Sequence, residues 1–212
     1  LAGRMQILRL HPLAQCELAR HQTQFIDRLF DARFRVHRSE RLADELVERI
    51  AGGGYPAALA LPAGRRRARW YQDYIETLVQ RDVRELARIS SLDALPRLLA
   101  FAAAQTGRLL NVADLAAPFQ LSRPTIRDYV TLLERVFLLS ELPPWHSNRS
   151  SRLVKTPKLH IGDSGLACAL LGANAASLKT DRMLLGQLVE TFVFQELRRE
   201  ASWHDEAHEF FH

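Results

Sequence analysis

Cysteine and long apolar runs are both scarce in this sequence. Only Cys16 and Cys168 occur, and they lie too far apart to form a disulfide framework or a cysteine-rich metal site. We therefore expect each to be a small buried apolar residue. No run approaches the roughly 20 apolar residues of a membrane helix, and the first residues lack the charged-then-apolar order of a signal peptide. These absences predict a cytoplasmic protein with no membrane partner and give no support to metal dependence.

Lysine is also rare. It occurs only at positions 155, 158 and 179, so arginine carries almost all of the positive charge behind the net charge of +5. Arginine suits phosphate because its planar guanidinium donates two parallel hydrogen bonds to paired oxygens. The codon usage of a GC-rich genome explains the same excess, together with the abundant alanine and leucine. The charge is therefore compatible with a nucleic-acid partner and does not by itself establish one.

The first third of the chain contains a predicted strand, a helix and a glycine turn. The 212 residues, 47% of them hydrophobic, suffice to bury a core in one domain or two small ones. Residues 5–10 are typical of a short strand that Pro12 ends, and apolar residues at helical spacing follow over residues 13–30. The three glycines at 52–54 precede Tyr-Pro, whereas a phosphate-binding Walker loop requires Lys and Ser or Thr. They indicate a turn, and we expect this chain neither to bind nor to hydrolyse ATP.

A long amphipathic helix is predicted to begin near Arg65, in the stretch RRRARWYQDYIETLVQRDV. The arginines in its first turns are unfavourable to the helix dipole unless an anion lies close to them. Two interpretations stay open at this point. The cluster either contacts a phosphate backbone or is a solvated helix start.

Residues 95–136 have the pattern of a helix-turn-helix. An apolar helix over residues 95–106 is closed by glycine, a short second helix follows the N-cap Asn111, and a third runs from Ser122 to about residue 136. Two strand-like segments, 137–142 and 152–163, then flank a loop that resembles a wing. The sequence predicts a winged helix, and its third helix should bury Ile126, Tyr129, Val130 and Leu133. Because Gln120 stands where glycine is common and Pro118 removes a hydrogen bond, we expect a looser turn than usual.

The outward side of the third helix holds the candidate nucleic-acid contacts. A recognition helix reads base edges in the major groove with such positions, and wing cations bind phosphates. Asp128 and Glu134 dilute the positive charge. Protein docking or self-association through the same surface is therefore the alternative, because winged helices serve both purposes. The candidate residues are Arg123, Thr125 and Arg127 on the helix and Arg149, Arg152 and Lys155 on the wing.

The last segment offers an acid and a histidine motif. An amphipathic helix is predicted from about residue 184 to 200, with Glu190 beside its apolar stripe as either the partner of an arginine or a metal-directed acid. The final residues, HEFFH, match the His-Glu-x-x-His of zinc peptidases, in which His208 and His212 would bind the metal from one helical face. The two phenylalanines between them favour a strand. The motif therefore predicts a strand, with a zinc hydrolase as the competing interpretation.

Five motifs in order give the chain a family resemblance. They are LAGR with L-x-PL at the start, GGYP at 53–56, Y-x-x-TL with RDV at 74–83, RLVKTPKLH-x-x-D-x-GL at 152–166 and LG-x-L-x-ETFVF-x-EL at 185–197. Together they resemble the prokaryotic AAA-type P-loop ATPases with a C-terminal domain of unknown function. The resemblance covers essentially the whole chain.

The resemblance implies that this chain is a fragment. The nucleotide core, with the ATP and Mg²⁺ of the full-length protein, would lie upstream, and a segment similar to PD-(D/E)xK nucleases would continue downstream. HEFFH would then be the first strand of that nuclease-like sheet, with no zinc site, and Glu190 would match the helix acid of such nucleases. The fragment itself would be no enzyme and hold no cofactor.

The prediction as a whole is a mainly α fold with a small β component. A helical region over residues 1–92 precedes the winged helix-turn-helix of residues 93–163 and an incomplete α/β nuclease-like lobe over residues 164–212. The predicted function is that of an accessory, DNA-binding region of an uncharacterised ATPase. The alternative is a docking or oligomerisation module of the same ATPase.

Overall fold

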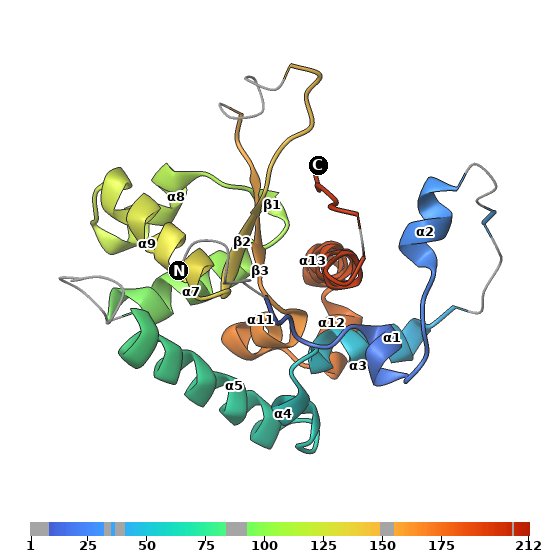
Figure 1. The fold of residues 1–212 in the computed structure, drawn as a ribbon. Helices are drawn as coiled ribbons and strands as arrows, with labels where there is room; N and C mark the ends of the chain where they lie inside the picture. Colours follow the sequence, from blue (N-terminus) through green and yellow to red (C-terminus); the bar gives the residue numbers. More distant parts are fainter. Residues whose placement is uncertain (1–8, 32–34, 37–40, 84–92, 149–154, 205) are drawn as a thin grey trace, which may run out of the picture.

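The computed structural model describes residues 9–31, 35–36, 41–83, 93–148, 155–204 and 206–212, and over these the chain is mainly helical with one small antiparallel sheet (Figure 1). The predicted fold class is confirmed at this level. None of the helices in these ranges is both long and apolar enough to cross a membrane. The helices are α1 (Gln15–Leu18), α2 (Phe25–Phe30), α3 (Ala43–Gly52), α4 (Pro56–Leu59), α5 (Arg65–Thr77) with its π-helical continuation η1 (Leu78–Val83), α7 (Ala94–Ala104), α8 (Val112–Ala116), the 3₁₀ turn η2 (Ala117–Phe119), α9 (Arg123–Arg135), α11 (Ser164–Leu171), α12 (Ala175–Thr180) and α13 (Arg182–Ala201).

The sheet lies at the centre of the molecule. Its strands are β1 (Arg108–Leu109), β2 (Leu139–Leu142) and β3 (Lys158–Ile161), in the spatial order β1-β3-β2 with both pairings antiparallel. The helices α7 and α9 lie on one side of the sheet and α13 lies on the other (Figure 1). Leu159, His160 and Ile161 of the middle strand are all buried, because helices cover both faces.

The helix ends predicted in the middle of the chain are confirmed. The Asn111 side chain accepts the N–H groups of Ala113 and Asp114 at the start of α8. The Ser122 hydroxyl accepts the N–H of Thr125 at the start of α9. Between these two helices Gln120 adopts the left-handed conformation, with φ 55° and ψ 31°, that glycine would adopt at lower cost. The predicted inward stripe of α9 is buried at Ile126, Tyr129, Val130 and Leu133.

One hydrophobic core joins the helices and strands from α3 to α13. Its buried members run from Val47 in α3, through Leu99 in α7 and Leu166 in α11, to Phe192 in α13. Cys168 belongs to this core and Cys16 is buried as well, as expected of small apolar residues. Burial raises the pKa of the Cys168 thiol to about 12, so this thiol stays protonated.

The N-terminal helix is shorter than predicted. The spacing over residues 13–30 indicated one helix, but α1 ends at Leu18 and Arg20 adopts a positive φ of 54°. The N–H of Gln15 donates to Glu196 of α13 at 2.6 Å, so a tertiary contact fixes where α1 starts. The strand expected over residues 5–10 lies mostly outside the described residues, and Arg9 and Leu10 form no strand.

The helix α13 was predicted at nearly its observed bounds, but its buried face only in part, at Leu188 and Phe192. The sequence indicated an apolar stripe, whereas Thr191, Gln195 and Arg199 lie on the buried side and Val193 is 48% exposed. Gln195 Nε2 donates to the carbonyl of Ile161 in β3 at 2.9 Å. Hydrogen bonds to the sheet therefore decide which face of α13 turns inward.

A buried ion pair joins distant parts of the chain. Arg199 Nη2 lies 2.7 Å from Asp163 Oδ2, and the two side chains are 2% and 0% exposed. Asp163 also caps the N-terminus of α11 and accepts the N–H of Gly54 at 2.8 Å. Arg199 Nη1 donates to the carbonyl of Leu13 at 3.1 Å and to Glu196 at 2.7 Å. The glycines predicted as a simple turn are thus part of a buried polar junction.

Candidate nucleic-acid interface

The outward residues of α9 differ in how available they are. Arg123 is exposed in the first turn, and its side chain has no ion pair with any of the described residues. The hydroxyl of Thr125 lies 2.7 Å from that of Ser122, within the cap of the helix. Arg127 is engaged, because its guanidinium lies 2.5 Å from the Glu141 carboxylate of β2. Of the three predicted helix residues, Arg123 is therefore the cation free to bind an anion.

Glu134 is a second carboxylate on the outward side of α9, beside Glu141. Glu134 accepts the backbone N–H of Glu141 at 3.0 Å, and burial raises the pKa of Glu134, with Glu141 as the next contribution. The exposed Asp128 adds a further negative charge next to Arg127. The predicted positive stripe thus stops at the first turn of α9. No large apolar side chain is exposed on α9.

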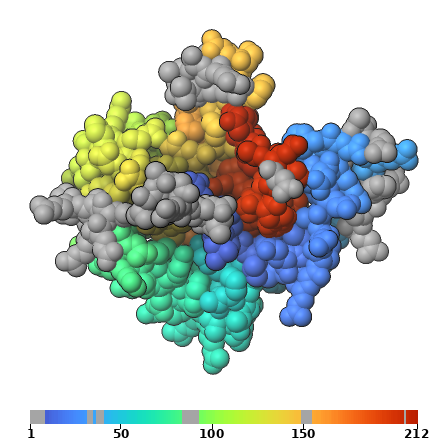
Figure 2. Space-filling view, in the orientation of Figure 1, coloured from blue at the N-terminus to red at the C-terminus, as the bar shows by residue number. Residues whose placement is uncertain are grey.

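The loop between β2 and β3 is the most basic segment near α9. No acidic residue occurs between Glu141 and Asp163. The same stretch contains Arg149, Arg152 and Lys155 together with one further lysine and two histidines. Arg149 and Arg152 lie outside the described residues, and Lys155 is exposed. The described parts of the loop, residues 143–148 and 155–157, extend away from the body of the molecule (Figures 1 and 2).

The C-terminal residues run beside the base of this loop. The N–H of Trp145 donates to the carbonyl of His212 at 2.9 Å, and the N–H of His212 donates to that of Pro143 at 3.0 Å. The Trp145 and Phe211 rings pack edge to face with centroids 5.3 Å apart. Residues 206–212 form no regular strand, so the strand predicted for HEFFH is not observed, although the segment is hydrogen-bonded to the chain after β2.

The histidine motif does not have the shape of a zinc peptidase site. Residues 206–212 form no helix, so the spacing of His208 and His212 does not bring both rings onto one helical face. His208 instead stacks on Phe30 of α2 with ring centroids 5.3 Å apart and contacts His204. Within the ranges that the structure describes, no three His, Cys, Asp or Glu side chains are grouped to hold a metal ion.

Glu190 of α13 forms an ion pair, but with a lysine where an arginine was expected. Its carboxylate lies 2.5 Å from Lys158 Nζ on β3 and is 44% exposed. The same carboxylate lies 4.0 Å from the Nε2 atom of the buried His160. His160 Nδ1 in turn lies 3.0 Å from the Thr191 hydroxyl. A metal-directed role for Glu190 stays a prediction.

Lowering the pH from 6.5 to about 4 is expected to destabilise the protein through His160. Burial lowers the pKa of this histidine from 6.5 to about 4, so in this range the unfolded state binds a proton that the folded state excludes. The stabilisation present above pH 6.5 is therefore lost as the pH falls, by about 3 kcal/mol. Urea unfolding of the wild type and His160→Gln across this range checks the effect. Parallel losses in the two proteins would contradict it.

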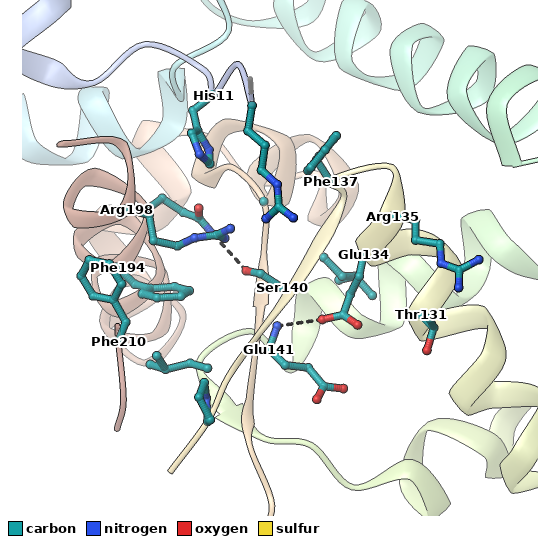
Figure 3. Close-up of a pocket in the computed structure, with 16 residues that line it drawn as sticks. His11, Thr131, Glu134, Arg135, Phe137, Ser140, Glu141, Phe194, Arg198 and Phe210 are labelled. Atoms are coloured by element: carbon teal, nitrogen blue, oxygen red, sulfur yellow. Dashed lines mark hydrogen bonds between the residues drawn. The ribbon is translucent and has the colours of Figure 1, made fainter. Parts of the chain in front are cut away.

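A pocket of about 580 Å³ opens between the end of α9, β2 and the last turns of α13 (Figure 3). In the close-up, Arg198 lies on one side of the pocket and Glu134 and Arg135 lie on the other, while Ser140 accepts a hydrogen bond from Gln195 Nε2 at 3.4 Å. Burial lowers the pKa of Arg198, and Arg9 and Arg199 lower it further. Burial and the three arginines also lower the pKa of His11. Local sequence patterns do not indicate this pocket, because its residues come from five separate segments.

Comparisons with known proteins give a family but no activity. Residues 43–177 match the model of a family described as a domain of unknown function (DUF8612). Two mycobacterial relatives, the uncharacterized protein Mb2031c of Mycobacterium bovis and the uncharacterized protein Rv2008c of Mycobacterium tuberculosis, are each 29% identical over 145 residues. The match covers 68% of this chain and 33% of each relative, so the chain spans about a third of the length of these relatives. No solved structure matches the chain.

Proposed function

The chain belongs to the DUF8612 family, and we propose that residues 93–163 form a winged helix that binds duplex DNA within a longer AAA-type ATPase. The order α7, β1, α8, α9, β2, β3 with the sheet order β1-β3-β2 supports the winged helix. In such a unit the N-terminal residues of the second helix of the helix-turn-helix enter the major groove. Here that helix is α9.

The observation that carries the proposal is the distribution of free charge. Arg123, at the N-terminal end of α9, forms no ion pair with any described residue, and the sequence between β2 and β3 contains only basic charges. Phosphate contacts of this kind position a protein on a duplex, and base contacts from the helix add specificity. Arg127 contributes less than its sequence position suggests, because Glu141 already neutralises it. A nuclease-like continuation after α13 and an ATPase core in the whole protein remain parts of this proposal that rest on the family resemblance.

Replacing Arg123 by alanine is expected to weaken duplex binding by about 1–3 kcal/mol, because a phosphate or base contact is lost. The triple replacement of Arg149, Arg152 and Lys155 by alanine should weaken it further, and Arg127→Ala should have the smaller effect. Fluorescence anisotropy of a labelled duplex at low ionic strength measures all of these. Thermal midpoints of the Arg123 and Arg127 variants should stay within a few degrees of wild type, since both side chains are exposed.

Arg182→Ala is the matched control. Arg182 is an exposed arginine at the start of α13, so its removal changes the net charge equally without touching α9 or the loop. Equal weakening by Arg182→Ala and Arg123→Ala would show that only overall charge matters. Unchanged binding in the Arg123 and loop variants would favour protein docking through this surface.

A further inference from the structure

The arginines around the α9–β2–α13 pocket form no ion pair with any described residue, and the nearby Glu134 only partly offsets the burial of Arg198. Arg198 is half-buried, and the contact found for its guanidinium is the Phe194 ring, whose centroid lies 5.4 Å from Cζ. Arg9 and Arg135 line the same pocket from exposed positions. Among the described residues, none of these three arginines forms an ion pair. Charged groups withdrawn from water are ordinarily paired, because removing their hydration is costly.

The two carboxylates of the pocket are already occupied. Glu134 accepts the N–H of Glu141, and Glu141 pairs with Arg127 outside the arginine group. The neighbouring Arg199 does not line the pocket and is ion-paired with Asp163 and Glu196. The two adjacent arginines of α13 therefore differ. Arg199 is buried and ion-paired, whereas Arg198 forms no ion pair with a described residue and lines the pocket (Figure 3).

We propose that this pocket binds a phosphate group, with Arg198 as its main ligand and Arg9 and Arg135 at its rim. Three unpaired guanidinium groups match a multiply charged anion better than a single carboxylate, and each can donate two hydrogen bonds to paired oxygens. Ser140 provides a hydroxyl on the floor of the pocket, which lies within the size range of small-ligand sites. Phe137, Phe194 and Phe210 form the apolar part of the pocket wall.

The phosphate group has one of two sources, and both present the same chemistry to the pocket. It belongs either to the backbone of DNA held by the neighbouring loop or to a free phosphate-bearing molecule. The pocket is continuous with the loop through Pro143, which lines it and begins the loop after β2. The first source rests on the proposed function, and the second does not depend on it.

The first test uses inorganic phosphate and the full chain. Isothermal titration at constant ionic strength should give saturable binding with a dissociation constant on the order of 1 mM or tighter. Arg198→Gln should weaken this binding by about tenfold or more, because charged hydrogen bonds are lost. Arg198→Lys, which keeps the charge but loses the planar fork, should be intermediate. Arg182→Gln on the same helix should bind as wild type does.

A structural role for Arg198 is tested by stability. Because Arg198 is unpaired and repelled by Arg9 and Arg199, Arg198→Gln should leave the thermal midpoint unchanged or raise it. Phosphate should raise the midpoint of wild type more than that of the variant. Absence of saturable phosphate binding by wild type up to about 10 mM, or equal binding by Arg198→Gln, would overturn the proposal.

Duplex binding then identifies the source. If the phosphate is a DNA backbone phosphate, Arg198→Gln should weaken duplex binding, and inorganic phosphate should compete with the duplex at constant ionic strength. If it belongs to a free molecule, duplex binding should be the same in both proteins and insensitive to phosphate. A chain that binds phosphate but no duplex would leave the pocket established and the DNA-binding proposal refuted.

Discussion

Replacing Arg199 by alanine is expected to lower the free energy of unfolding by about 3–5 kcal/mol, the largest effect of any single substitution considered for this chain. The change removes the partner of Asp163, a carboxylate with no exposed surface, and leaves its charge buried without compensation. It also removes the hydrogen bond to the Leu13 carbonyl that holds the N-terminal segment. Urea denaturation followed by circular dichroism measures the loss.

Arg198→Ala is the control for this prediction. The two arginines are neighbours on α13, but Arg198 has no carboxylate partner among the described residues. Arg198→Ala removes the same charge and the same side-chain volume as Arg199→Ala. It should nevertheless change the free energy of unfolding by about 1 kcal/mol or less. If both variants are destabilised equally, the ion pair does not account for the stability of this junction.

Gly53→Ala is expected to be nearly as damaging, at about 3 kcal/mol. Gly53 has φ 69° and ψ −160°, a conformation that costs residues with a Cβ atom about 1–3 kcal/mol. An added Cβ would also lie 2.1 Å from Asp163 Oδ1 and 2.5 Å from the Tyr71 hydroxyl. The junction would have to open to relieve these overlaps, which adds to the backbone cost.

Gly64→Ala separates the two causes. Gly64 has a similar backbone conformation, with φ 99° and ψ −142°, but an added Cβ would meet nothing within 4 Å. Thermal unfolding should therefore show a smaller loss for Gly64→Ala, and the difference reports the contact with Asp163. Equal losses would assign the whole effect to backbone strain.

Local signals in the sequence predicted the middle of the chain well. Asn111 and Ser122 cap their helices through hydrogen bonds to residues two or three positions away, and the apolar spacing of α9 encodes its buried face. Such features depend on neighbouring residues, so a single sequence contains them. The helix start at Arg65 was predicted for the same reason.

Long-range contacts were not predictable in this way. The inward turn of Gln195 and Arg199 depends on partners in β3 and at Asp163, so the apolar spacing of α13 identified only part of its buried face. The pairing of Arg127 with Glu141 likewise follows from the packing of α9 on β2. A charged residue on the outward side of a predicted helix is therefore not always free to bind a ligand. In this chain the candidate interface loses Arg127 as a free cation.

The most direct test of the DNA-binding claim is the salt dependence of duplex binding by the wild-type chain. If Arg123 and the loop cations neutralise about four or five phosphates, the logarithm of the association constant should fall against the logarithm of salt concentration with a slope of roughly −3 to −5. The dissociation constant for a nonspecific duplex should lie in about the micromolar range at low salt. A slope near zero, or no binding at low ionic strength, would contradict the account.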